Sequence, residues 1–205
     1  AVVCASPSAR SQFMIVSELL SVSVKQLLRE NGPLGTAQAL DFGTQVARGM
    51  RYLHALGMIH RDLKCANLLI DRRTQTVRIC DFGLSRFVNN TVMTACAGTP
   101  KWEAPECLDS TVYTTAADVY SFGMTLWEMA TAEEPFPAVS NIFELKKLVC
   151  DKKKRPALPA GLHPLLRELI KACWSATPKK RPTFAQIVQQ LDNFAALSAA
   201  QQQHQ

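Results

Sequence analysis

The segment 116–131 constrains the fold more than any other part of this 205-residue chain. Its sequence, AADVYSFGMTLWEMAT, is apolar on nearly every side of the helix that its spacing predicts. A helix of this kind must be covered on all sides, so we expect it at the centre of a helical domain. Pro135 and Pro137 follow it and are expected to end the helix.

The rest of the chain is predicted to be mostly helical, with a few short strands. The capping-box pattern T-x-x-Q at Thr183 marks the start of the last helix. A polar loop over 84–99 is too long for a simple connection and is expected to be functional. The other predicted elements are a buried strand within 13–20, helices over 36–54, 141–150 and 163–174, and a hairpin formed by 68–70 and 77–80.

Composition excludes several classes of protein. Hydrophobic residues make up 47% and charged residues 20%, as in ordinary folded domains and unlike disordered chains. No apolar run approaches the ~20 residues of a membrane-spanning helix, so no integral membrane segment is expected. The net charge of +6 is too small to indicate nucleic-acid binding.

The seven cysteines are scattered and include no C-x-x-C pair. This spacing favours reduced thiols over a disulfide framework or a zinc site. We therefore expect a cytoplasmic protein. The basic run at 152–155 keeps a nuclear location open, although a solvated loop is the simpler interpretation.

Three short motifs occur in a defined order: H-R-D-L-K-C-A-N at 60–67, D-F-G at 81–83 and A-P-E at 104–106. Together they resemble the catalytic loop, the magnesium-binding motif and the end of the activation segment of protein kinases. The resemblance continues through D-V-Y-S-F-G at 118–123 and the ending P-K-K-R-P-T-F at 178–184.

The resemblance implies an α+β protein-kinase-like fold that is represented mainly by its α-helical C-terminal lobe. Short hairpin strands and the end of the N-terminal-lobe sheet would complete it, with most of the N-terminal lobe absent. Residues 1–197 would form this partial kinase domain, and 198–205 a polar disordered tail.

The same resemblance implies ATP and Mg²⁺ as cofactors and assigns the catalytic residues. Asp62 would accept the proton of the attacking hydroxyl group, and Lys64 would reach the transferred phosphate. Asn67 and Asp81 would hold Mg²⁺ with oxygen ligands.

Adenine would bind at the start of the chain. Ser17 takes the gatekeeper position in this comparison, and the backbone of Glu18 and Leu20 would bind the base. Leu69 would lie beneath the adenine ring as an apolar floor.

Further residues are assigned structural or regulatory roles by the resemblance. His60 would stack near Phe82, Gly83 would allow a sharp turn, and Asp118 would hold the backbone of the catalytic loop. The remaining assignments are an Arg61 pair with a phosphate in the activation loop, a Thr99 bridge between Asp62 and Lys64, an ion pair of Glu106 with Arg181, and phosphorylation at Thr91 and Thr94.

Two features bear on the substrate. Lys64 and the pair Gly98-Thr99 resemble serine/threonine kinases, whereas Lys101-Trp102 and the Cys-Trp…Arg-Pro-x-Phe ending resemble tyrosine kinases. The group that combines both is the tyrosine-kinase-like serine/threonine kinases, which include the Raf and mixed-lineage types. Protein substrates follow from this, with a dual-specificity or tyrosine kinase as the alternative.

No glycine-rich loop and no Val-Ala-x-Lys strand precede residue 13. We therefore expect these 205 residues alone to be inactive, with the missing N-terminal lobe as their partner in the full-length chain. The alternative is a lobe-only binding or regulatory module, or a pseudokinase. The intact Asp62, Lys64, Asn67 and Asp81 favour the enzyme.

Overall fold

The computed structural model describes residues 2–5, 13–16, 18–87, 98–109 and 113–202. Ser17, Thr91 and Thr94 lie outside the described residues. The expected gatekeeper and the expected phosphosites are therefore not described by it.

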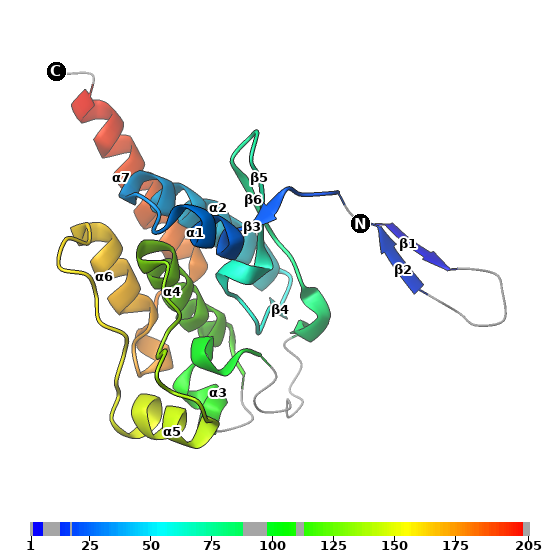
Figure 1. The fold of residues 1–205 in the computed structure, drawn as a ribbon. Coiled ribbons are helices and arrows are strands. Elements are labelled where there is room, and N and C mark those ends of the chain that lie inside the picture. The colour runs from blue at the N-terminus through cyan, green and yellow to red at the C-terminus, as the bar shows by residue number, and fades with distance from the viewer. Residues whose placement is uncertain (1, 6–12, 17, 88–97, 110–112, 203–205) are drawn as a thin grey trace.

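Helix α4 (Thr115–Thr131) lies in the middle of the helical body, as its apolar surface predicts (Figure 1). Every residue of 117–129 is buried. Helix α6 (Pro164–Cys173) packs closely against it: a Cβ added to Gly123 would lie 2.8 Å from the Cβ of Cys173. This contact requires a residue without a side chain.

The end of α4 differs from the prediction. The helix stops at Ala132, whose φ of 58° is left-handed and whose N–H donates to the carbonyl of Glu128 at 2.8 Å. This hydrogen bond is a typical C-terminal cap. Pro135 and Pro137 lie beyond the cap and do not end the helix themselves.

Helices α2 (Thr36–Ala55) and α7 (Phe184–Gln202) pack side by side on the core (Figure 1). The predicted capping box is confirmed: the N–H of Thr183 donates to Oε1 of Gln186, and the N–H of Gln186 to Oγ1 of Thr183. Because α7 continues to Gln202, residues 198–202 are helical and do not form the expected disordered tail.

The strands form short antiparallel pairs. The predicted hairpin is confirmed as β5 and β6, and its neighbour β3 places Ser23 opposite Leu69. A second pair joins β4 to β7, which come before and after the segment 60–85 in the chain, and the pair β1–β2 stands apart from the helical body in Figure 1. The bounds are β1 Val2–Ala5, β2 Phe13–Val16, β3 Val22–Ser23, β4 Met58–Ile59, β5 Leu68–Asp71, β6 Thr76–Ile79 and β7 Arg86–Phe87.

The remaining helices are short. They confirm the predicted fold class, which is mainly helical with short hairpin strands. Among the helices that the structure describes, none combines the length and apolarity needed to cross a membrane. The remaining helical segments are α1 Val24–Asn31, α3 Pro105–Asp109, α5 Ile142–Lys146, a π turn at Lys147–Asp151, and 3₁₀ turns at Cys65–Asn67, Phe82–Leu84, Pro100–Trp102 and Pro178–Lys180.

Candidate active site

The loop 60–67 connects β4 to β5 and is anchored to the central helix. Asp118 of α4 is fully buried and accepts the backbone N–H groups of His60 and Arg61, each at 2.9 Å. Its Oδ2 also lies 2.8 Å from Nε2 of His54. Arg61 has a left-handed φ of 73°, which costs an ordinary residue about 1–2 kcal/mol. The hydrogen bonds to Asp118 stabilise this turn.

Asp62 lies at the centre of a dense set of hydrogen bonds. Its Oδ1 accepts the N–H of Thr99 at 3.0 Å and the hydroxyl of Thr99 at 2.7 Å. Its Oδ2 accepts Nζ of Lys64 at 2.7 Å and Nδ2 of Asn67 at 2.8 Å. Nζ of Lys64 also donates to the Thr99 hydroxyl. The structure thus places Thr99 between the other two residues, as the bridge predicted from the sequence requires.

The charge of Asp62 follows from these contacts. Burial raises the pKa of its carboxyl group, but the hydrogen bonds from Lys64, Thr99 and Asn67 and the charge of Lys64 lower that pKa to below its ordinary value. Asp62 is therefore an anion at neutral pH and can accept a hydrogen bond or a proton from a hydroxyl group.

Asn67 and Asp81 lie at the two ends of the β5–β6 hairpin. The N–H of Cys80 donates to the carbonyl of Asn67 at 2.9 Å, which brings the next residue, Asp81, beside Asn67. Because Nδ2 of Asn67 is bound to Asp62, the Oδ1 atom of Asn67 is the one that can face a cation. Asp81 is exposed to solvent.

The sharp turn of the D-F-G segment is made by a different residue than predicted. Asp81 itself is left-handed, with a φ of 63°, whereas Gly83 does not have a positive φ. The N–H of Gly83 donates to Oδ1 of Asp81 at 3.4 Å. Aspartate tolerates this conformation because its carboxylate can accept such a local amide.

One carboxylate and one amide oxygen suit Mg²⁺. This ion is usually held by one or two carboxylates together with substrate phosphates, rather than by a cage of protein ligands. Among the described residues, no group of three or more His, Cys, Asp or Glu side chains could hold a metal ion. The donor set of Asn67 and Asp81 thus fits a cation that arrives with a phosphate ligand.

Of the residues expected to contact adenine, the structure describes Glu18, Leu20 and Leu69, and Leu69 is part of β5. The carboxylate of Glu18 accepts Nε of Arg78 at 3.0 Å in an exposed ion pair. The residue after Leu20, Ser21, donates its N–H to the carbonyl of Ile70 at 3.0 Å. This bond places Leu20 alongside the strand that carries Leu69.

Two predicted contacts are present in the structure. The rings of His60 and Phe82 meet edge to face, with centroids 5.3 Å apart. Arg181 forms a two-pronged ion pair with Glu106, at 2.6 Å for Nη1–Oε1 and 2.8 Å for Nη2–Oε2. The guanidinium of Arg61 lies over the ring of Tyr113, 4.4 Å from its centroid, while the loop expected to carry its phosphate partner is not described.

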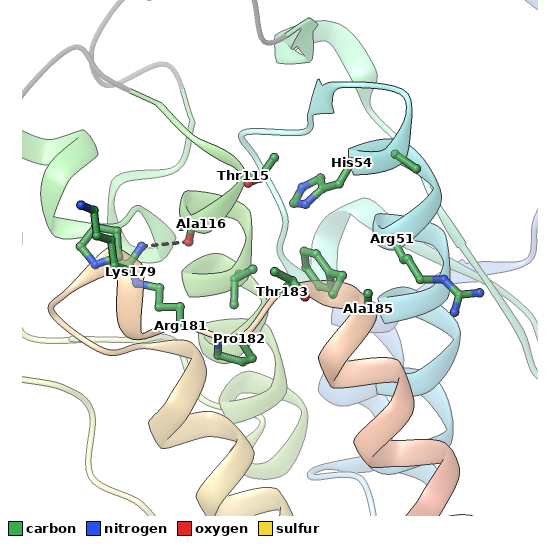
Figure 2. A pocket seen from close by; sticks show the side chains of 13 residues that line it. Arg51, His54, Thr115, Ala116, Lys179, Arg181, Pro182, Thr183 and Ala185 are labelled. Atoms are coloured by element: carbon green, nitrogen blue, oxygen red, sulfur yellow. Dashed lines mark hydrogen bonds between the residues drawn. The ribbon is translucent and has the colours of Figure 1, made fainter.

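A cavity of about 580 Å³ lies between the C-terminal end of α2 and the start of α4 and α7 (Figure 2). Figure 2 shows Arg51 and Lys179 at opposite sides of it, and Arg181 donating to the carbonyl of Ala116. The residues that line it do not include Asp62, Asn67 or Asp81. His54 connects its wall to Asp118 and hence to the catalytic loop.

A smaller cavity of about 220 Å³ adjoins the Asp62 cluster, because Thr99 is part of its wall. Trp102, Val139, Ile142 and Leu145 contribute apolar surface to it. A polypeptide side chain in this cavity would lie close to the carboxylate of Asp62.

Two buried carboxylates were missed by the sequence reasoning. Glu128 of α4 accepts Nζ of Lys25 at 2.9 Å, Nε1 of Trp102 at 3.0 Å and the N–H of Cys65 at 3.2 Å. A charged residue within a helix that is apolar on nearly every side was the signal that could have identified it, because a buried charge needs partners. Glu103 gave no such signal, since it lies between Trp102 and Ala104, outside any predicted helix or strand.

Comparisons with known proteins place this geometry in context. Residues 2–191 match the family described as protein tyrosine and serine/threonine kinase. A probable serine/threonine-protein kinase of Dictyostelium discoideum is 47% identical over 193 residues, which is 93% of this chain and 12% of the relative. The serine/threonine-protein kinase CTR1 of Arabidopsis thaliana is 42% identical over 182 residues, 85% of this chain and 22% of the relative.

A third relative is named for a broader specificity. The serine/threonine/tyrosine-protein kinase HT1 of Arabidopsis thaliana is 39% identical over 191 residues, covering 89% of this chain and 47% of the relative. The chain therefore spans less than half the length of each of these three relatives.

Proposed function

Because this chain belongs to the family of protein tyrosine and serine/threonine kinases, we propose that the protein transfers the γ-phosphoryl group of ATP to serine and threonine hydroxyl groups of other proteins. The observation that carries the proposal is the Asp62 carboxylate, which is buried, charged and bound to Lys64 and Thr99. A carboxylate in this state can orient a hydroxyl group and take its proton.

Asp62 and Lys64 have different roles in the same transfer. The substrate hydroxyl donates to the carboxylate of Asp62 while its oxygen forms a bond to the γ-phosphorus of ATP. The bond from that phosphorus to the bridging oxygen of ADP breaks, and the hydroxyl proton passes to Asp62. The ammonium of Lys64, 2.7 Å from Oδ2 of Asp62, stabilises the negative charge of the transferred group.

Asn67 and Asp81 are proposed to hold Mg²⁺ through their side-chain oxygens, and the bound ion would neutralise charge on the ATP phosphates. Adenine is proposed to lie on Leu69, with the backbone of Glu18 and Leu20 and the Ser17 position forming the edge of its site. The position of Leu20 alongside the strand that carries Leu69 supports this arrangement.

Specificity for serine and threonine is supported by the Lys64–Thr99 bond beside Asp62 and by the names of most of the relatives. Two relatives are named for wider activity: HT1, and the dual specificity protein kinase shkA of Dictyostelium discoideum. The assay that tests the proposal, described below, therefore also measures phosphorylation of tyrosine. The cavity beside Thr99 is where we place the polypeptide that carries the hydroxyl group.

Three further expectations remain proposals. Residues 1–197 would form the kinase domain, and Arg61 would pair with a phosphate on Thr91 or Thr94. A cytoplasmic or nuclear location is supported by the cysteines whose side chains are described, because Cys65, Cys80, Cys107, Cys150 and Cys173 are all free thiols.

The test is phosphoryl transfer by the intact native protein from radiolabelled Mg-ATP to peptides that contain serine, threonine or tyrosine. We expect Asp62→Asn to lower kcat about 10²–10⁴-fold, the range of a lost general base. Asp192→Asn is the matched control, because Asp192 forms an exposed ion pair with Arg48. An inactive wild type that Mg-ATP does not stabilise against heat would contradict the proposal and would favour a non-catalytic binding module.

A further inference from the structure

The carboxylate of Glu103 lies close behind the residues that contact Asp62. Glu103 follows the 3₁₀ turn Pro100–Trp102 and is only 4% exposed. A single oxygen, Oε1, accepts both the N–H of Gly98 and the hydroxyl of Tyr113, each at 2.8 Å. Its other oxygen, Oε2, has no hydrogen-bond partner among the described residues, so Oε1 carries the hydrogen bonds described for this carboxylate.

The backbone held by Glu103 is pressed against the catalytic loop. A Cβ added to Gly98 would lie 2.3 Å from the carbonyl oxygen of Arg61, a distance that atoms cannot reach without movement. Gly98 therefore lies close to both the Arg61 backbone and the Glu103 carboxylate, which is 3.2 Å from the same added atom. Glu103 thus binds the Gly98 backbone where that backbone approaches the loop 60–67.

The residue after Gly98 is Thr99, which gives Asp62 two of its hydrogen bonds. The path from Glu103 to Asp62 thus consists of one hydrogen bond, one peptide unit and the two bonds of Thr99. We propose that Glu103 is a positioning residue that holds Thr99 against Asp62 and so fixes the carboxylate that receives the substrate proton. This inference rests on the proposed kinase function.

An acceptor is the chemically required feature at this position. Methionine has a similar length to glutamate but cannot accept strongly, so Glu103→Met would leave the buried N–H of Gly98 and the hydroxyl of Tyr113 without this partner. Glutamine keeps a carbonyl oxygen in the same place and can accept both donors. The pair of variants therefore separates the hydrogen bonds from the shape of the side chain.

The experiment measures the intact protein with Glu103→Met and Glu103→Gln, and with Glu133→Met as a control at an exposed glutamate. We expect Glu103→Met to lower kcat about 10- to 100-fold, the effect of a displacement of order 1 Å in a catalytic group, with the KM for ATP unchanged. On a logarithmic scale, the loss of kcat in Glu103→Gln should be at most half of the loss in Glu103→Met. Glu133→Met should match the wild type.

A second measurement does not depend on activity. Hydrogen exchange of the Gly98 and Thr99 amides should be faster in Glu103→Met than in the wild type, while exchange in α4 stays the same. In a Thr99→Ala background, Glu103→Met should cost clearly less in kcat than it does alone, because both changes act on the same contact.

The outcomes separate the two proposals. Unchanged exchange at residues 98–99, additive losses with Thr99→Ala, or no restoration by glutamine would each overturn the role of Glu103. An inactive wild type overturns the proposed function, and the exchange measurement then still decides whether Glu103 holds this segment.

Discussion

The two aspartates of the candidate site are built in contrasting ways. Asp62 is buried and receives hydrogen bonds from three side chains and one backbone amide, supplied by two separate segments of the chain. Asp81 is exposed, and the described hydrogen bond to its carboxylate is the 3.4 Å contact from Gly83, two residues away. The first is fixed by tertiary structure, whereas the second is held by its local turn.

This difference matches what each residue is proposed to do. The group that receives a proton must already be in place, because its geometry decides the rate. A metal ligand is completed when the ion and the phosphates arrive, so fewer contacts within the protein are needed. Preorganisation is therefore concentrated at the group proposed to face the protein substrate.

The largest effect is expected when the anchor of the loop is removed. Asp118→Ala leaves the buried N–H groups of His60 and Arg61 without an acceptor, at about 1–3 kcal/mol each. We expect the free energy of unfolding to fall by about 3–5 kcal/mol, measured by urea denaturation. Asp192→Ala at the exposed pair should cost less than about 1 kcal/mol. Equal losses in the two variants would contradict the anchoring role.

Substituting asparagine for each of the two aspartates tests the contrast directly. The first of these substitutions is Asp62→Asn. Both carboxylate oxygens of Asp62 accept hydrogen bonds. The NH₂ group of an asparagine at this position would therefore face hydrogen-bond donors in either orientation of the amide. We expect Asp62→Asn to lower the free energy of unfolding by about 2–3 kcal/mol. A variant as stable as the wild type would show that these hydrogen bonds contribute to chemistry alone.

The pH dependence of stability sharpens the same point. Because the folded-state pKa of Asp62 is lowered, its contribution is fully present above the ordinary aspartate pKa and is lost as the pH falls through the lowered value. Lys64→Met removes a partner that lowers this pKa. It should reduce the free energy of unfolding by about 1–2 kcal/mol at pH 7. The cost should shrink as the pH falls toward 3. Urea denaturation at both pH values measures it, and Arg48→Met, at an exposed pair, should show little cost at either.

The smallest effect is expected at the second aspartate. Asparagine tolerates the left-handed conformation and can accept the same local amide, so Asp81→Asn should change the free energy of unfolding by less than about 0.5 kcal/mol. In the intact protein, thermal stabilisation by Mg-ATP should nevertheless be lost. A large drop in stability without nucleotide would mean that Asp81 is held by more than its turn.

Much of the site could be predicted from the sequence, because its motifs resemble those of a known family and the resemblance implies pairs of residues that act together. The contacts of Asp118 with the catalytic loop, of His60 with Phe82 and of Arg181 with Glu106 were all expected from such motifs. The central position of α4 followed from its apolar surface alone.

The missed features depend on tertiary structure. Whether a carboxylate is buried depends on which donors reach it, and Lys25 reaches Glu128 from 103 positions away. Oε1 of Glu103 accepts hydrogen bonds from Tyr113 and Gly98, which no pattern within a helix or strand connects to it. The sequence predicted a sharp turn at Gly83 because glycine is conformationally free, yet the left-handed residue of this segment is Asp81, whose carboxylate accepts a local amide.

The long-range anchor of the catalytic loop also has a consequence during synthesis. Asp118 lies 58 positions after His60, so the loop leaves the ribosome before its acceptor has been made. At about 5–20 residues per second, this delay is roughly 3 to 12 seconds. The nascent chain therefore passes through a period in which Asp62 exists without an ordered loop around it. Arrested nascent chains that end before and after α4 should differ in protease cleavage at 60–67, and equal cleavage would contradict this order of assembly.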